Sequence, residues 1–205
     1  MQRRLGLTGG IATGKSTVSD YLAHRHHLPV LDADVFAREA VAVGSEILEA
    51  ITQRYGSTLL QVDGTLNRSQ LGQIIFSDPD ERVWLEAQIH PYVRDRFDQA
   101  IANLPVTTTV VLSIPLLFEA QLTALVSEIW VVSCNENQQL ERLMVRNQLT
   151  LQQSQQRIQA QLPLVQKCAA ADVVLDNSGS RDWLYAQIDR HLASSANLLN
   201  IGQDK

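Results

Sequence analysis

The chain has 205 residues, of which 45% are hydrophobic and 19% charged, a composition typical of one globular domain. Its formal net charge of −5 argues against nucleic acid or an anionic membrane surface as a partner. No apolar run is long enough to span a membrane, and Cys134 and Cys168 follow no metal-binding spacing, so we expect a cytoplasmic protein with reduced thiols.

The first predicted elements are a strand, a glycine-rich loop and a helix. The stretch LGLTGGIATGKSTV (5–18) contains the pattern G-x-x-x-x-G-K-[ST] between an apolar strand and a helix predicted over 16–27. Glycine lets the backbone approach a phosphate closely, and the N–H groups at the helix start then face the anion. Lys15 would reach the β- and γ-phosphates. The residues predicted to bind the nucleotide are Gly10, Ala12, Thr13, Gly14, Lys15, Ser16 and Thr17.

A second short strand is predicted over 28–34 and ends in two aspartates, Asp32 and Asp34. A spacing of two in extended chain puts both side chains on one face, at the carboxyl edge of a parallel sheet beside the phosphate loop. A carboxylate there can orient an acceptor hydroxyl or hold Mg²⁺. We therefore expect the hydroxyl of Ser16 to bind Mg²⁺, with Asp34 as a candidate second ligand for the ion or as the group that orients the acceptor hydroxyl. The alternative for both aspartates is an Asx-type turn and helix cap.

The segment 35–104 is predicted to be mainly helical. About seventy residues are too many for one crossover, so we expect a helical insertion over about 45–104. Its helices are predicted at 45–56, with Ser45 as cap, at 67–76 and at 80–104. Pro91 marks a kink or break in the last of these helices.

The rest of the chain alternates strands and helices, which predicts a parallel sheet with helices on both faces. Strands are expected at 107–119, 128–134 and 171–179, and helices at 137–147, 150–161 and 180–192, followed by a frayed tail from Ala193. The cluster His24, His26 and His27 ends the first helix, where imidazoles favour the helix dipole, and we do not expect it to bind metal.

Two arginines on the predicted helix 137–147 are candidates for contacting a transferring phosphoryl group. Arg142 and Arg146 are four residues apart and so share one helical face. The alternative is a solvated basic face. Arg157 and Lys167 would add charge to a mobile lid over about 140–168.

The phosphate loop alone does not name a reaction, because switches, motors and kinases share it. The guanine-reading motif N-K-x-D and an L-S-G-G-Q-like signature are both absent from the sequence, and the strand 109–114 ends without an aspartate. A small-molecule kinase therefore remains, acting on a nucleoside monophosphate, a shikimate-like hydroxyl or another alcohol. An ATP-binding regulatory module without an acceptor is the alternative from another class.

Taken in order, the motifs resemble the dephospho-coenzyme A kinases of the bacterial single-domain type over almost the whole chain. The matching segments are LTGGIATGKSTV, VLDAD followed by Ala37-Arg38-Glu39, IHPYVR (89–94), IPLLFE (114–119) and WVVSCNENQQLERLMVRN (130–147). The segment 157–179 is similar to the family's lid and final turn. Ala12-Thr13 departs from the family's usual Gly-Ser, with little expected consequence because both pairs supply backbone N–H groups.

The resemblance implies a single P-loop kinase domain over 1–205 that transfers the γ-phosphoryl group of ATP to the ribose 3′-hydroxyl of dephospho-CoA, the last step of CoA synthesis. It assigns Asp34 to the acceptor hydroxyl, so the expected catalytic groups are Asp34, Lys15, Arg142 and Arg146. It places Asn177 near the adenine of ATP. The residues implied at the acceptor are Asp34, His90, Arg94, Leu116 and Glu119. Without the resemblance, His90 reads as a helix-break residue and Glu119 as a helix-start carboxylate.

Overall fold

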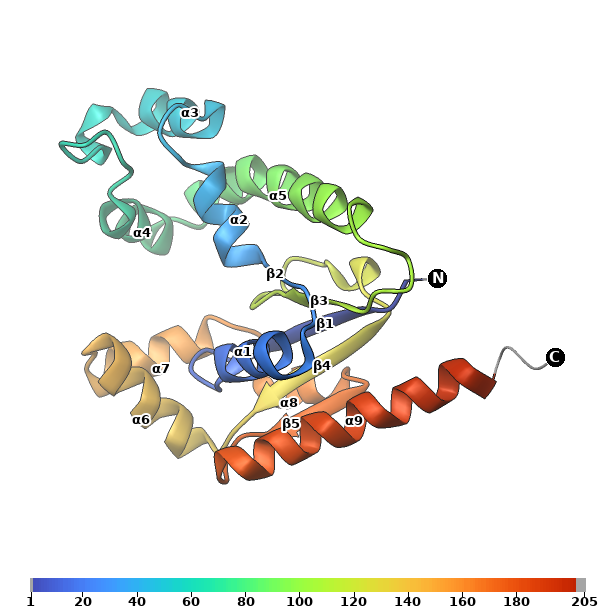
Figure 1. Cartoon of the computed structure of the whole chain (residues 1–205). Helices are drawn as coiled ribbons and strands as arrows, with labels where there is room; N and C mark the ends of the chain where they lie inside the picture. The colour runs from blue at the N-terminus through green and yellow to red at the C-terminus, as the bar shows by residue number, and fades with distance from the viewer. Residues whose placement is uncertain (1, 202–205) are drawn as a thin grey trace. The chain divides into compact units, whose positions relative to one another are not determined.

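The computed structural model describes residues 2–201, with side chains as far as Ser194. The chain forms two compact units, one from residues 1–31 and 106–205 and the other from residues 32–105. The helical insertion predicted at about 45–104 lies within the second unit. Each unit is described by itself below, and Figure 1 labels the elements.

The first unit is built on a five-stranded sheet in the order β2-β3-β1-β4-β5. The strands are β1 (Arg4–Gly9), β2 (Val30–Asp32), β3 (Val110–Ser113), β4 (Glu128–Ser133) and β5 (Val173–Asp176). β1 pairs in parallel with both β3 and β4, and β4 pairs in parallel with β5. The predicted α/β architecture with a parallel sheet is confirmed.

Helices cover both faces of this sheet. They are α1 (Lys15–His26), α6 (Glu136–Asn147), α7 (Leu151–Gln159), α8 (Leu164–Ala169) and α9 (Arg181–Ile201), with a short 3-10 turn, η2 (Thr123–Leu125). Leu5 and Leu7 of β1 point to one face, where α1 and α9 pack (Figure 1). Because successive strand residues alternate, Leu112 and Val131 face the other side, and both are completely buried there.

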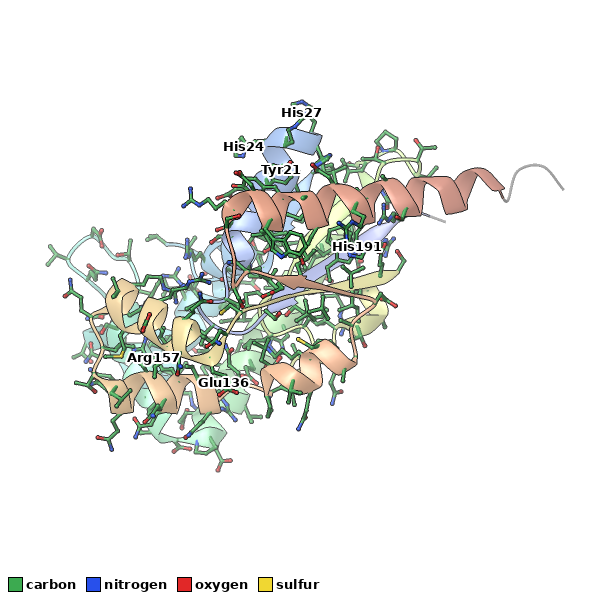
Figure 2. All side chains as sticks on the ribbon, turned by 90° about the horizontal axis from the view of Figure 1, so that it is seen from below. Tyr21, His24, His27, Glu136, Arg157 and His191 are labelled. Atoms are coloured by element: carbon green, nitrogen blue, oxygen red, sulfur yellow. The ribbon has the colours of Figure 1, made fainter. Side chains whose placement is uncertain are left out.

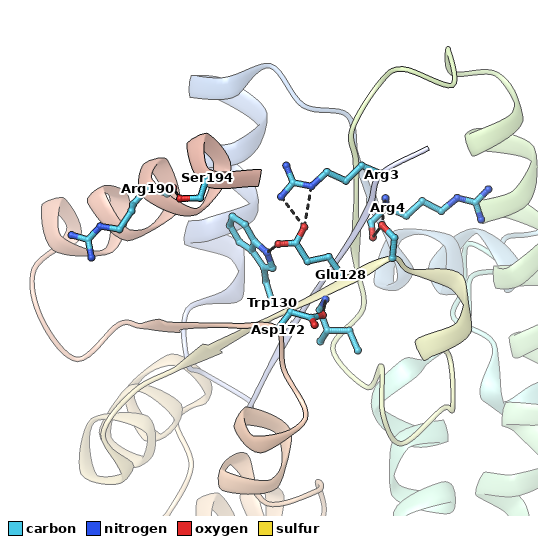
Figure 3. A network of polar contacts seen from close by, with 9 residues as sticks. Arg3, Arg4, Glu128, Trp130, Asp172, Arg190 and Ser194 are labelled. Carbon is cyan, nitrogen blue, oxygen red and sulfur yellow. Dashed lines mark hydrogen bonds and ion pairs between the residues drawn. The ribbon is translucent and has the colours of Figure 1, made fainter. Parts of the chain in front are cut away.

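The strands are joined at their amino ends by a polar network, shown in Figure 3. Glu128 lies between Arg3 and Trp130, accepting from the Arg3 guanidinium at 2.7 Å and from the indole N–H of Trp130 at 2.7 Å. Asp172 accepts from the backbone N–H of Ile129 at 2.7 Å. The network therefore links β1, β4 and the start of β5 at the end opposite the loop that follows β1.

All the longer regular elements of the second unit are helices. They are α2 (Ala33–Ala40), α3 (Glu46–Tyr55), the 3-10 turn η1 (Ser57–Leu59), α4 (Arg68–Ser77) and α5 (Pro79–Ala102). Phe36 of α2 meets Phe97 of α5 edge to face, with ring centroids 5.1 Å apart. A separate apolar core joins α3, α4 and the first half of α5 around Leu48, Ile51 and Leu85. Among the described residues of either unit, no helix is long and apolar enough to cross a membrane.

Two predicted boundaries are wrong. The strand expected over 107–119 is limited to β3, Val110–Ser113, because Pro115 follows and the chain turns there. The apolar residues Ile114 and Leu117 of the expected strand are instead buried in and beside this turn. The helix expected to fray from Ala193 continues to Ile201, since no glycine or proline interrupts it; residues 202–205 lie outside the described part.

Pro91 does not break its helix. α5 runs through it without interruption from Pro79 to Ala102. Proline removes the hydrogen bond to the carbonyl four residues earlier, that of Ala87. Ala87 and Pro91 are both exposed, so water can satisfy that carbonyl, while Val93 and Phe97 anchor the other face of the helix in the core.

Candidate active site

The loop between β1 and α1 can be formed only with glycine at two of its motif positions. Gly14 has φ of 101°, in the left-handed region, and a Cβ there would collide with the side-chain amide of Asn177. A Cβ at Gly9 would lie 2.6 Å from the carbonyl oxygen of Val132 on the neighbouring strand. The glycines thus allow the loop to pack tightly against β4 and the turn after β5.

The amino end of α1 carries no side-chain cap, whereas α2 to α7 each begin with one. The first N–H groups of a helix have no partner within the helix, and the helix dipole makes this end positive. Ser16 is exposed in this first turn. An uncapped, glycine-led helix start of this kind suits a phosphate group.

The loop lysine is held at the carboxyl end of a neighbouring strand. The Nζ of Lys15 donates to the hydroxyl of Ser113 at 2.5 Å. Ser113 is the last residue of β3 and is completely buried. The serine occupies the strand end where we noted the absence of an aspartate, and it fixes the direction of the lysine.

Three amide side chains hold the loop backbone from distant parts of the chain. Gln139 of α6 donates to the carbonyl of Ile11 at 2.8 Å, and the N–H of Ile11 donates to the side-chain oxygen of Gln161 at 2.8 Å. Asn177 donates to the carbonyl of Thr13 at 2.8 Å. The loop conformation is therefore fixed by the protein itself, which is the condition for a preorganised anion site.

Lys167 was predicted to add charge to a mobile lid, but its charge is buried and paired instead. Its side chain is completely buried, with Nζ 2.7 Å from the carboxylate of Glu119, 3.3 Å from the carbonyl of Gly9 and 3.5 Å from that of Pro115. The same carboxylate oxygen accepts from the N–H of Leu162 at 3.0 Å. A buried ammonium needs such partners, and here they join the start of the loop to the segment after β3. No helix begins at Glu119, so its helix-start interpretation is wrong as well.

The two candidate arginines of α6 differ in their surroundings. Arg142 donates to the carbonyl of Asn177 at 3.1 Å, and its Nη1 is buried without a partner among the described residues. Arg146 is exposed and donates to the side chain of Asn147 at 2.8 Å. The description as a solvated face therefore fits Arg146 but not Arg142, which is fixed against the turn that also holds the loop.

We expected the two aspartates to share one face of an extended strand, but they do not. β2 ends at Asp32, and α2 begins at Ala33. The carboxylate of Asp32 caps α2 by accepting from the N–H of Asp34 at 2.8 Å, which confirms the helix-cap alternative for this residue. Asp34 lies in the first turn of α2, and its side chain is exposed.

Comparison with known proteins decides between the kinase alternatives. A family model described as dephospho-CoA kinase matches residues 3–182. The chain belongs to the dephospho-CoA kinase family. The curated dephospho-CoA kinase of Trichormus variabilis is 62% identical over 188 residues, covering 92% of this chain and 95% of that protein. That of Synechococcus elongatus is 54% identical over 190 residues, covering 93% and 91%.

Solved structures share the fold of this chain. A Thermus thermophilus crystal structure matches with a TM-score of 0.80 at 33% identity, covering 94% of this chain and 97% of that one. A shikimate kinase from Aquifex aeolicus matches at a TM-score of 0.54 and 15% identity, which shows the shared fold alone. As a member of the dephospho-CoA kinase family, the chain uses ATP to phosphorylate dephospho-CoA in the last step of CoA biosynthesis.

One loop residue departs from the dephospho-CoA kinase pattern at a conformationally demanding position. Ala12, where the family usually has glycine, has φ of 61°. A left-handed conformation costs an L-residue about 1–2 kcal/mol. Thr13, where the family usually has serine, is buried and donates its hydroxyl to the carbonyl of Gly10 at 2.9 Å.

The acceptor residues implied by the dephospho-CoA kinase family are on two units. His90 and Arg94 are four residues apart on α5 of the second unit, share a helical face and are both exposed. Asp34 also belongs to the second unit, whereas Leu116, which is 41% exposed, and Glu119 belong to the first.

The histidines and cysteines do not form a second site. His24 and His27 are exposed at the carboxyl end of α1 (Figure 2), and His26 contacts Asp189 at 2.8 Å. No group of three metal-binding side chains occurs in the described part of the chain. Burial raises the pKa of the thiols of Cys134 and Cys168, which disfavours their reactive thiolate forms.

Sequence reasoning missed Ser113, Gln139 and Gln161 as supports of the phosphate loop. Serine and glutamine are common polar residues, and nothing local marks these three. Lys167 carried a signal that could have been used: it is one of only three lysines and stands in the apolar stretch LPLVQKCAA. A lone lysine within an apolar helix indicates a buried and paired charge.

Proposed function

We propose that the β- and γ-phosphates of ATP bind the loop residues 10–17, with Lys15 directed at them and the adenine near Asn177. The support is the uncapped start of α1, the fixed loop backbone and the 2.5 Å contact that holds Lys15 at the end of β3. Phosphoryl transfer depends mainly on positioning and charge stabilisation, and this arrangement supplies both.

We propose Mg²⁺ as the accompanying ion. The exposed hydroxyl of Ser16 and the exposed carboxylate of Asp34 are hard oxygen donors of the kind that Mg²⁺ prefers, and few protein ligands are needed because Mg²⁺ keeps several waters and binds substrate phosphates. When bound, the ion neutralises charge on the transferring group. Ser16 and Asp34 are the two proposed protein ligands of the Mg²⁺ ion.

Asp34 is proposed to receive the proton of the ribose 3′-hydroxyl, or to orient that hydroxyl. A ribose hydroxyl is a poor nucleophile, and a carboxylate within hydrogen-bond reach contributes typically about 10²–10⁴-fold. Asp34 suits this role better than Asp32 because the carboxylate of Asp32 caps α2, whereas that of Asp34 is exposed.

Arg142 and Arg146 are proposed to stabilise charge on the phosphoryl group, and His90, Arg94, Leu116 and Glu119 to contact the acceptor. Glu119 binds Lys167 and the N–H of Leu162 through one oxygen, which leaves the second oxygen for the acceptor. Arginine geometry suits a phosphoryl group because the planar guanidinium donates several hydrogen bonds in one direction.

We further propose that the chain acts as one P-loop kinase domain in the cytoplasm, with the helical insertion at about 45–104 and the lid at about 140–168. Its partners would be small molecules, because a net charge of −5 disfavours nucleic acid and anionic membranes. The two free cysteines are consistent with a reducing compartment.

The observation that carries these roles is the fixed glycine loop with Lys15 held at Ser113. The test is incubation with Mg-ATP and, separately, dephospho-CoA, AMP, shikimate or no acceptor. We expect ADP release and a phosphate added to the 3′-oxygen only with dephospho-CoA, measured by mass spectrometry and phosphorus NMR. Faster turnover with AMP or shikimate, or ADP release without any acceptor, contradicts the proposal.

A further inference from the structure

Lys167 of α8 is the only charged residue among the buried side chains of the described part of the chain. An ammonium group loses its hydration when it is buried, so each of its three N–H groups needs an acceptor within the protein. Lys167 has three such acceptors, the carboxylate of Glu119 at 2.7 Å and the carbonyls of Gly9 at 3.3 Å and Pro115 at 3.5 Å. The ammonium therefore joins three separate points of the first unit.

The three acceptors of Lys167 belong to two parts of the candidate active site. Gly9 is the first glycine of the phosphate-loop motif. Pro115 and Glu119 lie on the segment after β3, and Glu119 is one of the residues proposed to contact the acceptor. The hydroxyl of Thr8 also donates to the carbonyl of Pro115, at 3.0 Å, so the end of β1 is tied to this segment a second time. Lys167 thus connects the phosphate loop to the acceptor carboxylate.

The residues before Lys167 make two further contacts to the same two parts. The side-chain oxygen of Gln161 accepts from the N–H of Ile11 in the phosphate loop at 2.8 Å. The N–H of Leu162 donates at 3.0 Å to Oε1 of Glu119, the same oxygen that Lys167 contacts. The segment 161–167 therefore holds the loop on one side and orients the Glu119 carboxylate on the other.

We propose that Lys167 is a positioning residue for phosphoryl transfer, which sets the direction of the Glu119 carboxylate relative to the phosphate loop. The proposal rests on the proposed binding of ATP at the loop and of the acceptor at Glu119. Lys167 contacts neither substrate in this role. Phosphoryl transfer needs the attacking and leaving oxygens in line, and a misplacement of about 1 Å can lower the rate about 10²-fold. A residue that fixes the two binding parts relative to each other therefore acts on turnover.

A second ion pair of the first unit supplies a matched control. The guanidinium of Arg3 lies 2.7 Å from the carboxylate of Glu128, and the two side chains are only 13% and 19% exposed. This pair is at the ends of the strands opposite the phosphate loop (Figure 3). Arg3→Met removes the cation of a largely buried pair, as Lys167→Met does, but leaves both binding parts untouched.

The test compares these two variants with the unmodified chain by kcat and KM for dephospho-CoA and by the Kd for ATP from calorimetry. We expect Lys167→Met to lower kcat/KM for dephospho-CoA about 10-fold or more. The Kd for ATP should stay within about threefold, because Lys15, Gln139 and Asn177 still hold the loop. Arg3→Met should change neither quantity. Lys167→Gln keeps a hydrogen-bond donor and is measured in parallel, with a smaller loss expected, so that a folded variant is available if Lys167→Met does not fold.

A double-mutant cycle tests whether Lys167 acts through Glu119. Glu119→Ala removes the proposed acceptor contact, so we expect it to lower kcat/KM for dephospho-CoA by itself. Adding Lys167→Met to this variant should then change kcat/KM less than about twofold, since no carboxylate remains to be oriented. Losses that multiply in the double variant would show that Lys167 acts independently of Glu119 and would overturn the proposal.

Three results with the single variants also overturn it. Folded Lys167 variants with kcat/KM within about twofold of the unmodified chain would make the ion pair purely structural. An equal loss in Arg3→Met would attribute the effect to stability. A rise in the Kd for ATP that accounts for the whole loss would confine the role of Lys167 to the loop. If the unmodified chain does not phosphorylate dephospho-CoA, it is the proposed function that fails. Thermal unfolding of each variant verifies that folded proteins are compared.

Discussion

The two units of the chain present their polar groups in different ways. In the first, the recognition surface is backbone, and Gln139, Gln161 and Asn177 hold that backbone from more than a hundred residues away. In the second, Asp34 and Arg38 are exposed side chains on a helix.

The loop geometry therefore depends on segments from the whole first unit, whereas the proposed acceptor contacts depend on individual exposed side chains. Substitutions in the supports of the loop should therefore change stability along with activity. Substitutions on the exposed helix faces of the second unit should change kinetics alone. The predictions below test this difference, beginning with the largest expected effect.

Lys15→Ala should lower kcat/KM by about 10²-fold or more, because the lysine charge acts on the transferring group. The melting temperature should stay within a few degrees, since the loop backbone keeps its other supports. Steady-state kinetics and thermal unfolding measure the two quantities. Activity close to that of the unmodified protein would refute the phosphate-loop assignment.

Asp34→Asn should lower kcat by about 10²-fold with nearly unchanged ATP binding, because the amide keeps the shape of the side chain and cannot accept the proton. Asp32→Asn is the matched control. Asparagine caps a helix about as well as aspartate, so this variant should keep both its fold and its rate. The reverse result, with Asp32→Asn inactive and Asp34→Asn active, would show that the acceptor carboxylate is Asp32 and not Asp34. Recovery of Asp34→Asn at raised Mg²⁺ would assign the residue mainly to the metal.

Arg142→Ala and Arg146→Ala should each lower kcat by about 10-fold or more if they meet the γ-phosphoryl group. They should differ in ATP affinity. Arg142 contacts the turn at Asn177, which holds the loop, so its loss should also weaken ATP binding, whereas Arg146 is exposed and its loss should not. Kinetics together with ATP titration by calorimetry separate the two. Unchanged kcat in both variants would mean that Arg142 is only structural and that Arg146 is a solvated surface residue.

Glu119→Gln should lower the free energy of unfolding by about 2 kcal/mol, because it leaves the ammonium of Lys167 buried without its charged partner. Lys167→Met should cost less, since Glu119 is partly exposed and water can solvate the carboxylate that remains. Urea unfolding measures both. A greater loss in Lys167→Met would mean that the buried ammonium contributes mainly through its hydrogen bonds to the carbonyls of Gly9 and Pro115.

The smallest expected effect concerns Tyr55 of the second unit, whose hydroxyl donates to Glu81. Burial, and then the hydrogen bond to Glu81, raises the pKa of Tyr55 to about 12. Because this pKa is higher in the folded state, the stabilising contribution is complete below about pH 10 and is lost as the pH rises toward 12. Tyr55→Phe should therefore flatten the fall of stability between these pH values without changing kcat at neutral pH. Unfolding curves across the alkaline range test this, and an unaltered pH dependence would contradict it.

The amino-acid sequence predicted the phosphate loop because the motif that marks it is local. The glycines that permit its backbone, the lysine and the first turn of the following helix lie within eight residues, Gly9–Ser16. Helix and strand periodicity likewise indicated the parallel sheet and the long helical segment, since the repeat of apolar residues reports which face is buried. The cap at Ser45 and the helix that closes on Gly56 follow from the same local chemistry.

Only the tertiary structure decided what the remaining polar residues do. Lys167 was expected only to add charge to a lid, and its burial against Glu119 and the carbonyl of Gly9 came from the fold. Asp32 and Asp34 were equivalent in sequence until the start of α2 made one a cap and the other an exposed carboxylate. The physical reason is that burial and hydrogen-bond partners depend on segments brought together by the fold, and no local pattern records which distant segment arrives.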